Sequence, residues 1–276
     1  MGAEEKKEMI RVFPRKTKAS PTDSKAYFGP PDMFVSDEEI HVSCAFTWDI
    51  PYAEVLCKQW ESYGKVTLGG PAFNQEGDGF VPGRYLKHGY TITSRGCPNR
   101  CWFCSVWKRE PRLKELEIQD GWNVLDDNLL ACSDNHIASV FTMLQRQPKP
   151  IEFTGGFEAK RLKPWHAELL TTIRLGQVFF AYDTVDDLDP LVCAAKMLSD
   201  AGLMSRKMRC YVLIGYRGDT FEKAEARLLR TLDLGYFPMA MLYTEDGKYD
   251  REWRRLQREW VRPAIINTRL KKWRKK

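Results

Sequence analysis

From residue 89 to residue 245 the chain alternates short runs of β-branched or aromatic residues with segments whose apolar residues recur at helical spacing. Six strand and helix units at this spacing need crossover connections, so they predict a parallel sheet. Right-handed crossovers curl such a sheet toward a partial barrel. The predicted strands lie near residues 90–93, 122–126, 150–154, 177–182, 209–214 and 238–243.

The flanking segments differ from this repeating pattern. Residues 1–40 are rich in Pro, Lys, Ser and Asp, apart from the apolar stretch Met9–Phe13, and are predicted to form an extended arm. Residues 41–88 read as a β-α-β extension followed by a Gly-rich loop, and residues 246–276 as a basic helix and tail. The expected fold is therefore α/β: a partial (βα)6 TIM-like barrel over residues 89–245, with an N-terminal β-α-β extension and a basic helical C-terminal segment.

The net charge of +6 is unevenly distributed. From Arg251 to Lys276 there are eleven basic and two acidic residues, a net +9, so the first 250 residues carry −3. Trp253, Trp260 and Trp273 interrupt this basic segment, which suits contacts with phosphates and stacking on bases. The alternative is a solvated helix and tail that packs on the barrel.

Composition also bears on the compartment. No apolar run approaches the roughly 20 residues of a membrane span, and the first residues lack the apolar centre of a secretion signal. We therefore expect a soluble, cytoplasmic protein without a membrane partner. Eight cysteines in a reducing compartment call for metal or redox chemistry where they cluster, and for burial where they are scattered.

Three cysteines do cluster: Cys97, Cys101 and Cys104 have the spacing C-x3-C-x2-C directly after a predicted strand. Such a loop can place three thiolates on three corners of an iron-sulfur cubane and leave the fourth iron open. A structural zinc site needs a fourth Cys or His, and a thioredoxin-like pair would leave Cys97 unexplained. The remaining cysteines have no paired spacing; Cys132 is the one candidate for a second thiol role, and the others are expected in the core: Cys44, Cys57, Cys193 and Cys210.

The cysteine segment resembles the cluster motif of the radical S-adenosylmethionine (radical SAM) superfamily, of the CxxxCxxC type. In that family an aromatic residue precedes the third cysteine, as Phe103 does here. Gly155, Gly156 and Glu158 are similar to the family's Gly-Gly-Glu motif, whose backbone binds the amino group of SAM. This chain departs from the motif because Phe157 is inserted before Glu158.

Two later strand ends extend the resemblance. Asp183 stands where the family places a polar residue for the SAM ribose, and Ile214 lies in a strand that resembles the one packing on the adenine. Asp126 and Asn128 resemble a segment of the radical SAM tRNA methylthiotransferases and their cobalamin-dependent relatives. These two side chains either face the substrate or cap the following turn.

The resemblance implies a [4Fe-4S] cluster, SAM, and an electron donor of the flavodoxin or ferredoxin type. The expected activity is reductive cleavage of SAM to a 5′-deoxyadenosyl radical that removes hydrogen from a substrate. The basic segment 251–276 indicates a nucleic acid or nucleotide as the substrate, and a metabolite or peptide is the alternative. The unit at 41–71 resembles the last piece of a cobalamin domain but is too short, and no Asp-x-His-x-x-Gly signature occurs. Two other functions stay open: a non-catalytic zinc or iron-sulfur module that binds nucleic acid, and a radical SAM methyl- or methylthiotransferase.

Overall fold

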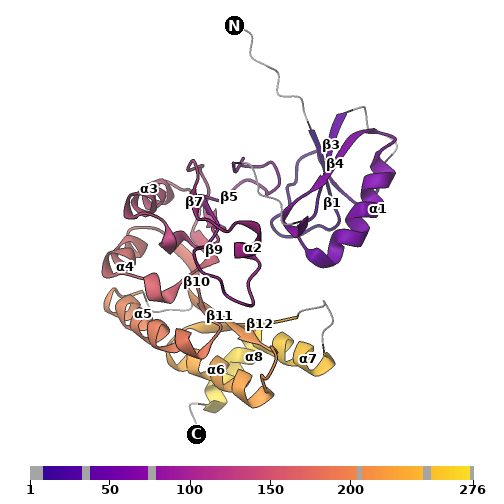
Figure 1. The fold of residues 1–276 in the computed structure, drawn as a ribbon. Coiled ribbons are helices and arrows are strands. Elements are labelled where there is room, and N and C mark those ends of the chain that lie inside the picture. The colour runs from indigo at the N-terminus through magenta and orange to yellow at the C-terminus, as the bar shows by residue number, and fades with distance from the viewer. Residues whose placement is uncertain (1–8, 33–37, 74–78, 204–206, 245–249, 274–276) are drawn as a thin grey trace.

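The computed structural model describes residues 9–32, 38–73, 79–203, 207–244 and 250–273 of the 276-residue chain. Within these ranges the protein is a mixed α/β structure with two separate parallel sheets and eight α-helices (Figure 1). Each larger sheet has its own hydrophobic core. The chain therefore forms an N-terminal unit and a larger second unit.

The N-terminal unit is a four-stranded parallel sheet with the order β2-β1-β3-β4. Its helix α1 (Ile50–Trp60) buries Ala53, Leu56 and Trp60, the face that the sequence predicts, with Cys57 half-buried beside them. The predicted β-α-β extension is thus present as part of this unit. Its strands are β1 (Met9–Phe13), β2 (Ala26–Phe28), β3 (Glu38–Ser43) and β4 (Gly64–Gly69).

The expectation of an extended arm over residues 1–40 is wrong for β1 and β2. β1 lies between β2 and β3, where Ile10 pairs with Ile40 and is almost completely buried. The apolar stretch Met9–Phe13 is a sheet strand because burial against α1 and β3 removes it from water. Arg11 on the same strand is also buried, and its guanidinium donates to the carbonyl oxygens of Gly83 (2.9 Å) and Arg84 (2.7 Å).

The second unit contains a six-stranded parallel sheet in which the strands follow sequence order, β5-β8-β9-β10-β11-β12. All six predicted strands are present. The first two are short, and β9 continues three residues beyond its predicted end, through Gly155 and Gly156. The strands are β5 (Tyr90–Thr91), β8 (Asn123–Val124), β9 (Ile151–Phe157), β10 (Leu175–Tyr182), β11 (Met208–Ile214) and β12 (Phe237–Leu242).

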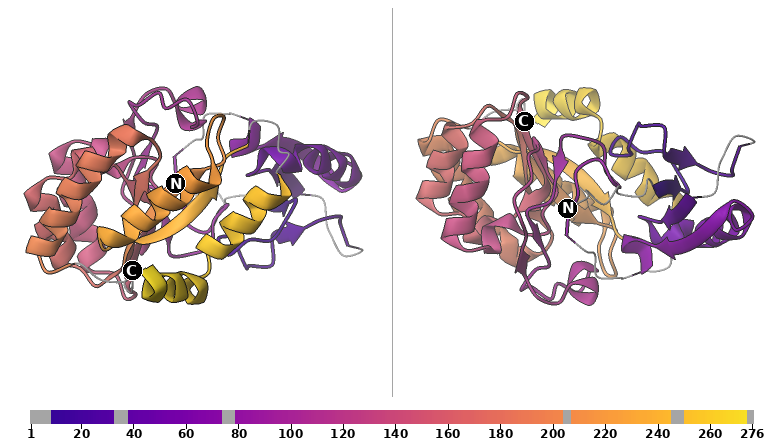
Figure 2. Two further views of the ribbon diagram at one scale, coloured as in Figure 1. Left: turned by 90° about the horizontal axis from the view of Figure 1, so that it is seen from below. Right: turned by 90° about the horizontal axis from the view of Figure 1, so that it is seen from above.

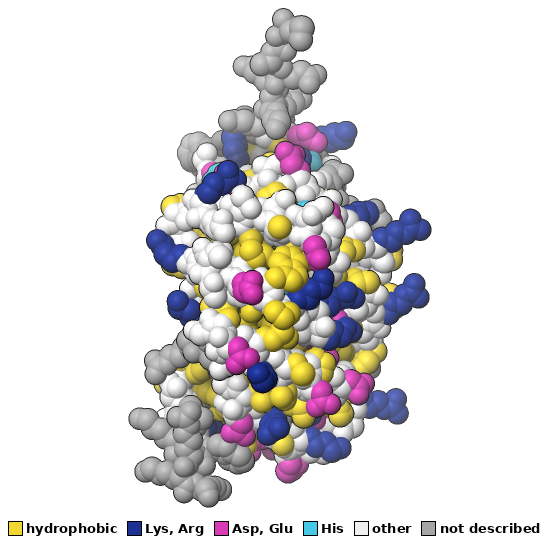
Figure 3. All heavy atoms as spheres, turned by 90° about the vertical axis from the view of Figure 1, so that its left-hand side faces the viewer, with side chains coloured by type: hydrophobic (Ala, Val, Ile, Leu, Met, Phe, Trp, Pro, Cys, Tyr) yellow, Lys and Arg dark blue, Asp and Glu magenta, His cyan; other side chains and the backbone are white. Residues whose placement is uncertain are grey.

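Four helices lie along one face of this sheet (Figures 1 and 2). They are α3 (Asp134–Gln145), α4 (Pro164–Thr171), α5 (Leu188–Asp200) and α6 (Phe221–Asp233). Ser133 caps α3 and Thr220 caps α6, each accepting a backbone N–H three residues on. The apolar residues that recur at helical spacing on α3, α5 and α6 are buried in the core, except that Phe221 at the start of α6 is partly exposed. On the outer face of these helices, basic and acidic side chains are interspersed (Figure 3).

Shorter elements connect the sheet to the helices. β6 (Ser94–Arg95) pairs antiparallel with β7 (Lys114–Glu115), and α2 (Val106–Arg109) lies between them. The cysteine segment is the loop from β6 to α2. Single 3-10 turns occupy Thr47–Asp49, Pro71–Phe73, Leu129–Ala131, Ala159–Arg161 and Val185–Asp187.

The basic C-terminal segment forms two helices, α7 (Arg251–Trp260) and α8 (Pro263–Trp273). Trp260 and Ile266 are fully buried in the core of the second unit, and Arg269 forms ion pairs with Glu225 and Glu259. One face of the segment is therefore part of the folded core. No helix in the described ranges has both the length and the apolar character of a membrane span.

Candidate functional site

The three clustered cysteines lie on a short loop that begins at Gly96. Gly96 has a φ of +82°, and a Cβ at this position would lie 2.2 Å from the carbonyl oxygen of Arg112, so only glycine fits. The loop turns at Cys101, whose carbonyl oxygen accepts the N–H of Cys104 (3.1 Å) and the indole N–H of Trp107 (3.0 Å). Cys97, Cys101 and Cys104 are all free thiols and half-buried.

The cysteine sulfurs are electrostatically coupled and accept weak hydrogen bonds. Burial raises the pKa values of Cys101 and Cys104, and negative charge on the neighbouring cysteines raises them further. The amide of Asn128 donates to Cys97 Sγ (3.3 Å), and the backbone N–H of Val106 donates to Cys104 Sγ (3.4 Å). In the described residues, no group of three or more His, Cys, Asp or Glu side chains has the arrangement that binds a single metal ion.

Asn128 connects the cysteine loop to Glu158, two residues that the sequence singled out separately. Asn128 is 4% exposed, and its Nδ2 also donates to Glu158 Oε2 (2.7 Å). Glu158 follows β9 and pairs with Lys160 (2.8 Å) and Arg161 (2.6 Å). Burial alone would raise the pKa of Glu158, but the hydrogen bonds from these partners outweigh it, so the pKa lies below its usual value. Glu158 is therefore a half-buried, neutralised carboxylate that Asn128 links to Cys97.

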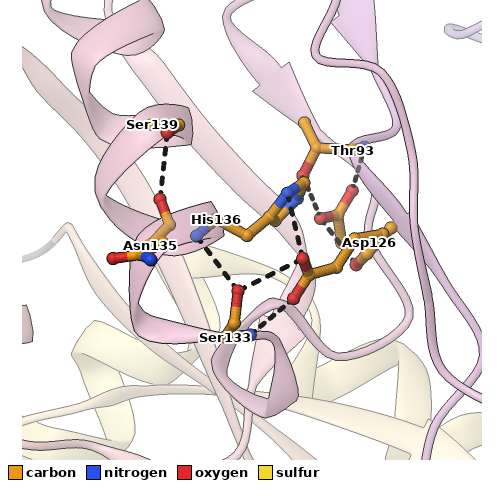
Figure 4. Close-up of polar contacts among 8 residues, drawn as sticks. Thr93, Asp126, Ser133, Asn135, His136 and Ser139 are labelled. Carbon is orange, nitrogen blue, oxygen red and sulfur yellow. Dashed lines mark hydrogen bonds and ion pairs between the residues drawn. The ribbon is translucent and has the colours of Figure 1, made fainter.

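The Asp126 side chain is enclosed in a buried hydrogen-bond network. It is 2% exposed, and its carboxylate accepts hydrogen bonds from the N–H (2.6 Å) and hydroxyl (2.5 Å) of Thr93 and from the Ser94 hydroxyl at 2.9 Å (Figure 4). Burial raises its pKa, and these hydrogen bonds oppose that shift. His136 reaches the same Thr93 hydroxyl at 3.3 Å. Asp126 therefore fixes the segment that leads into the cysteine loop.

The neighbouring Asp127, which the sequence did not single out, contacts the loop directly. Its Oδ2 accepts the backbone N–H of Gly96 at 2.9 Å, and its Oδ1 lies 3.5 Å from a guanidinium nitrogen of Arg109. Arg95 lies nearby: burial lowers its pKa, and the charge of Asp127 opposes that effect. The sequence feature that could have identified Asp127 is its position between Asp126 and Asn128 at the end of a predicted strand.

The two glycines of β9 have structural roles. A Cβ on Gly155 would lie 2.1 Å from the carbonyl oxygen of Asp126, so β9 and the segment after β8 approach too closely for a side chain. Gly156 has a φ of +92°, but a Cβ there would meet nothing closer than 3.9 Å. Phe157, the inserted residue, is a core side chain whose ring packs 4.8 Å from that of Phe153. Its insertion continues β9 by one residue before Glu158 reaches the edge.

Asp183 lies at the same edge of the sheet, whereas the side chain of Ile214 does not reach it. Burial raises the pKa of Asp183 to about 7; the negative charge of Asp187 adds to this shift, and Arg227 opposes it. The charge of Asp183 acts on Cys101 and Cys104. Ile214 is fully buried in the core that the helices cover. The Ile214 side chain therefore lies in the core, and a contact of its strand with adenine stays a prediction.

An aromatic cluster at the loop was missed by the sequence analysis. Trp102 is 52% exposed, and its ring centroid lies 5.2 Å from Phe103, 5.7 Å from Tyr216 and 5.2 Å from Tyr243. Tyr216 follows β11 and Tyr243 follows β12, so the loop reaches across to the far strands of the sheet. Aromatic residues at or near the ends of two predicted strands were the available signal.

Of the four scattered cysteines expected in the core, two are buried and Cys57 is half-buried. Cys44, Cys132 and Cys210 are buried, but Cys193 is exposed on α5, so its expected place in the core is wrong. Burial raises the pKa of Cys132 to about 11, which keeps the thiol protonated at neutral pH and opposes a second thiol role.

Comparison with protein-family models finds no match, and comparisons with curated proteins and with solved structures find no significantly similar protein. Function is therefore inferred from the residues of the site themselves.

Proposed function

We propose that the chain is a radical SAM enzyme in which Cys97, Cys101 and Cys104 hold a [4Fe-4S] cluster whose open iron binds SAM. The observation that carries the proposal is the position of the loop: its thiols stand beside Asn128 and Glu158, which follow two neighbouring parallel strands. Enzymes built on parallel strands place their active sites at this carboxyl edge. We further infer that the six strands curl into a partial (βα)6 barrel; their sequential order supports this inference.

The donor set suits such a cluster. Three thiols supply one ligand each to three irons, and the N–H groups of Asn128 and Val106 aim at two of the sulfurs. Hydrogen bonds of this kind tune iron-sulfur clusters. When bound, the cluster and SAM would supply the electron transfer and the 5′-deoxyadenosyl radical that removes hydrogen from substrate, with a flavodoxin- or ferredoxin-type protein as electron donor.

The chain's own residues would bind SAM and exclude water. Gly156 leaves its backbone open to a ligand, which suits contact with the amino group of SAM. Asp183 would accept hydrogen bonds from the ribose hydroxyls. Glu158 would act through Asn128, because Lys160, Arg161 and Asn128 already engage its carboxylate. Trp102, lying against Tyr216 and Tyr243, would cover the loop.

The test is anaerobic reconstitution with iron and sulfide, followed by dithionite and SAM. We expect about four irons per chain, a broad absorption band near 400 nm, and formation of 5′-deoxyadenosine. Cys101→Ala should lose iron and product, whereas Cys193→Ala, which removes an exposed thiol outside the loop, should retain both. A chain that binds four irons yet forms no 5′-deoxyadenosine with dithionite or flavodoxin contradicts the proposal.

For the substrate we propose a nucleic acid or nucleotide. The support is a stripe of exposed arginines on α7 and just after it, opposite the buried Trp260. α7 also lies beside the carboxyl end of β11, because the Trp253 ring stands 3.3 Å from where a Cβ on Gly215 would be. Four residues define the stripe, and the test changes the first three of them: Arg251, Arg255, Arg258 and Arg262.

Truncation at residue 250 is a poor test of the stripe, because it also removes Trp260 and Ile266 from the core. Charge removal is cleaner. Arg251→Gln, Arg255→Gln and Arg258→Gln together should weaken binding of single-stranded RNA. The slope of the logarithm of the binding constant against the logarithm of salt concentration should become less steep by about 2 to 3. The matched control changes three exposed basic residues elsewhere: Arg146→Gln, Lys196→Gln and Lys223→Gln. Equal salt slopes in both variants would reject a role for α7.

Metal analysis separates the enzyme from the non-catalytic module. About one zinc per chain and no iron after anaerobic purification would favour the module. A methyl- or methylthiotransferase would instead form S-adenosylhomocysteine or transfer a methylthio group, and mass spectrometry of the reaction with RNA distinguishes these products from 5′-deoxyadenosine alone.

A further inference from the structure

A cavity of about 430 Å³ lies between the N-terminal unit and the second unit. The segments that follow β1, β3 and β4 line one side of it, and residues 79–86 line another. The second unit contributes Arg95 and Arg109, while Cys97, Cys101 and Cys104 do not line it. It is therefore distinct from the site at the cysteine loop, and its size falls within the range of small-molecule pockets, about 300 to 1,000 Å³.

The topology of the N-terminal sheet marks this position independently of the cavity. In the order β2-β1-β3-β4, the chain passes from β1 to β2 on one side of β1, and then to β3 on the other side of β1. The strand order thus reverses between β1 and β3. Open parallel sheets bind ligands outside the carboxyl ends of the strands at such a point. The residues at the carboxyl ends of β1 and β3 flank this reversal point and line the cavity: Phe13–Arg15, Ser43, Ala45 and Phe46.

The charges in the cavity favour an anion. Four arginines line it against two carboxylates, Asp49 and Glu110, an excess of two positive charges. Arg15 is neutralised by its bidentate pair with Asp49, and Arg109 lies 3.5 Å from Asp127. Among the described residues neither Arg84 nor Arg95 forms an ion pair within 4 Å; the Arg84 guanidinium lies over the Tyr85 ring, and the charges of Asp127 and Glu110 act on Arg95. Guanidinium groups bind phosphate through paired hydrogen bonds, and a phosphate monoester carries about −1.5 to −2 at neutral pH.

The remaining lining suits a planar ring. Phe46 lines the cavity and stacks on the exposed Trp48 with centroids 4.8 Å apart, which holds its ring in place. His41 lines the cavity with Tyr85, and the two are hydrogen-bonded at 2.6 Å. Polar atoms therefore accompany the aromatic surface. A ligand with both an aromatic ring and a phosphate would use both kinds of lining.

We propose that this cavity binds a small phosphate ester that carries a planar ring, of the size of a nucleoside monophosphate, with Arg84 and Arg95 as its phosphate ligands. The site is separate from the cysteine loop, so it stands or falls independently of the radical SAM proposal.

Isothermal titration calorimetry on the full chain without a cluster tests the site. The probes are the four ribonucleoside 5′-monophosphates, with inorganic phosphate and the four nucleosides as references. We expect at least one nucleotide to bind with a stoichiometry of one, and more tightly than phosphate or its own nucleoside. Arg84→Gln should weaken binding about tenfold or more, since it removes a charge-assisted hydrogen bond. Arg146→Gln, at the exposed residue that follows α3, should leave binding unchanged.

A second variant distinguishes nucleotide binding in this cavity from nucleotide binding at the proposed SAM site. Ala45→Trp fills the cavity without removing a charge, and the exposed Ala138→Trp on α3 is its control. Binding should be lost in the first and kept in the second, with unchanged circular dichroism in both. Binding that survives both Arg84→Gln and Ala45→Trp, or the absence of nucleotide binding to the unmodified chain at millimolar concentration, overturns the proposal.

Discussion

Asp126 is the residue whose removal should most clearly loosen the cysteine loop. Asp126→Ala takes the acceptor from the buried N–H of Thr93, which costs about 2 kcal/mol for an unsatisfied donor. The two hydroxyl hydrogen bonds, from Thr93 and Ser94, add about 0.5 to 1 kcal/mol each, because a hydroxyl can rotate toward another acceptor. The expected loss is about 3 to 4 kcal/mol of unfolding free energy, or roughly 6 to 12 °C in Tm.

Urea denaturation of the cluster-free chain, followed by circular dichroism at neutral pH, measures this loss. Asp189→Ala, at an exposed aspartate, should change stability by less than about 0.5 kcal/mol. Ser94→Ala should cost about 1 kcal/mol alone but almost nothing in the Asp126→Ala background, because the two share one hydrogen bond. In Asp126→Ala the loop thiols should also react faster with a disulfide reagent. A loss below about 1 kcal/mol, or full additivity with Ser94→Ala, would refute the network described above.

Three further predictions concern other parts of the second unit. Burial lowers the pKa of His166 from 6.5 to about 4, so the unfolded chain binds the proton first and stability falls as pH drops below 6.5. The unfolding free energy should decrease by about 2 kcal/mol by a pH of about 5. In urea titrations, His166→Asn should remove this pH dependence. Gly155→Ala should destabilise the protein by about 2 kcal/mol or more, because the added Cβ meets the Asp126 carbonyl oxygen. Gly202→Ala is the control: its Cβ would lie in open space, so it should cost only about 1 kcal/mol for the positive φ. Equal losses in the two variants would remove the steric explanation. Trp260→Ala should cost about 3 to 5 kcal/mol, as for a core tryptophan, and a loss below 1 kcal/mol would mean that α7 is peripheral.

The second unit was predictable because its strands and helices alternate with clear periodicity. Ile137, Val140 and Leu144 define a helix face by spacing alone, and the structure buries all three. The strand β1 was harder to predict. Its five residues lie in a Pro- and Lys-rich stretch, and pairing with both β2 and the distant β3 makes it an inner strand. Short strands of this kind depend on tertiary pairing, which local composition does not contain.

The sequence likewise predicted some features of the candidate site and not others. Strand-end position correctly brought Asn128, Glu158 and Asp183 to one edge of the sheet. It did not distinguish which side chains turn inward: Asp126 and Ile214 are buried, one in a hydrogen-bond network and the other in the core. In a strand the side-chain direction alternates at every residue, so an uncertainty of one residue in register reverses the interpretation.

The packing of α7 and α8 has a consequence for synthesis of the chain on the ribosome. The N-terminal unit contains all of its strands by Gly69 and has its own core, so it can fold while the remainder is still being translated. The core of the second unit includes Trp260 and Ile266, and is completed only after those residues have emerged. The cysteine loop, synthesised some 150 residues earlier, would therefore wait in an incomplete unit, in which its three thiols are exposed to oxidation before the last helices close the core.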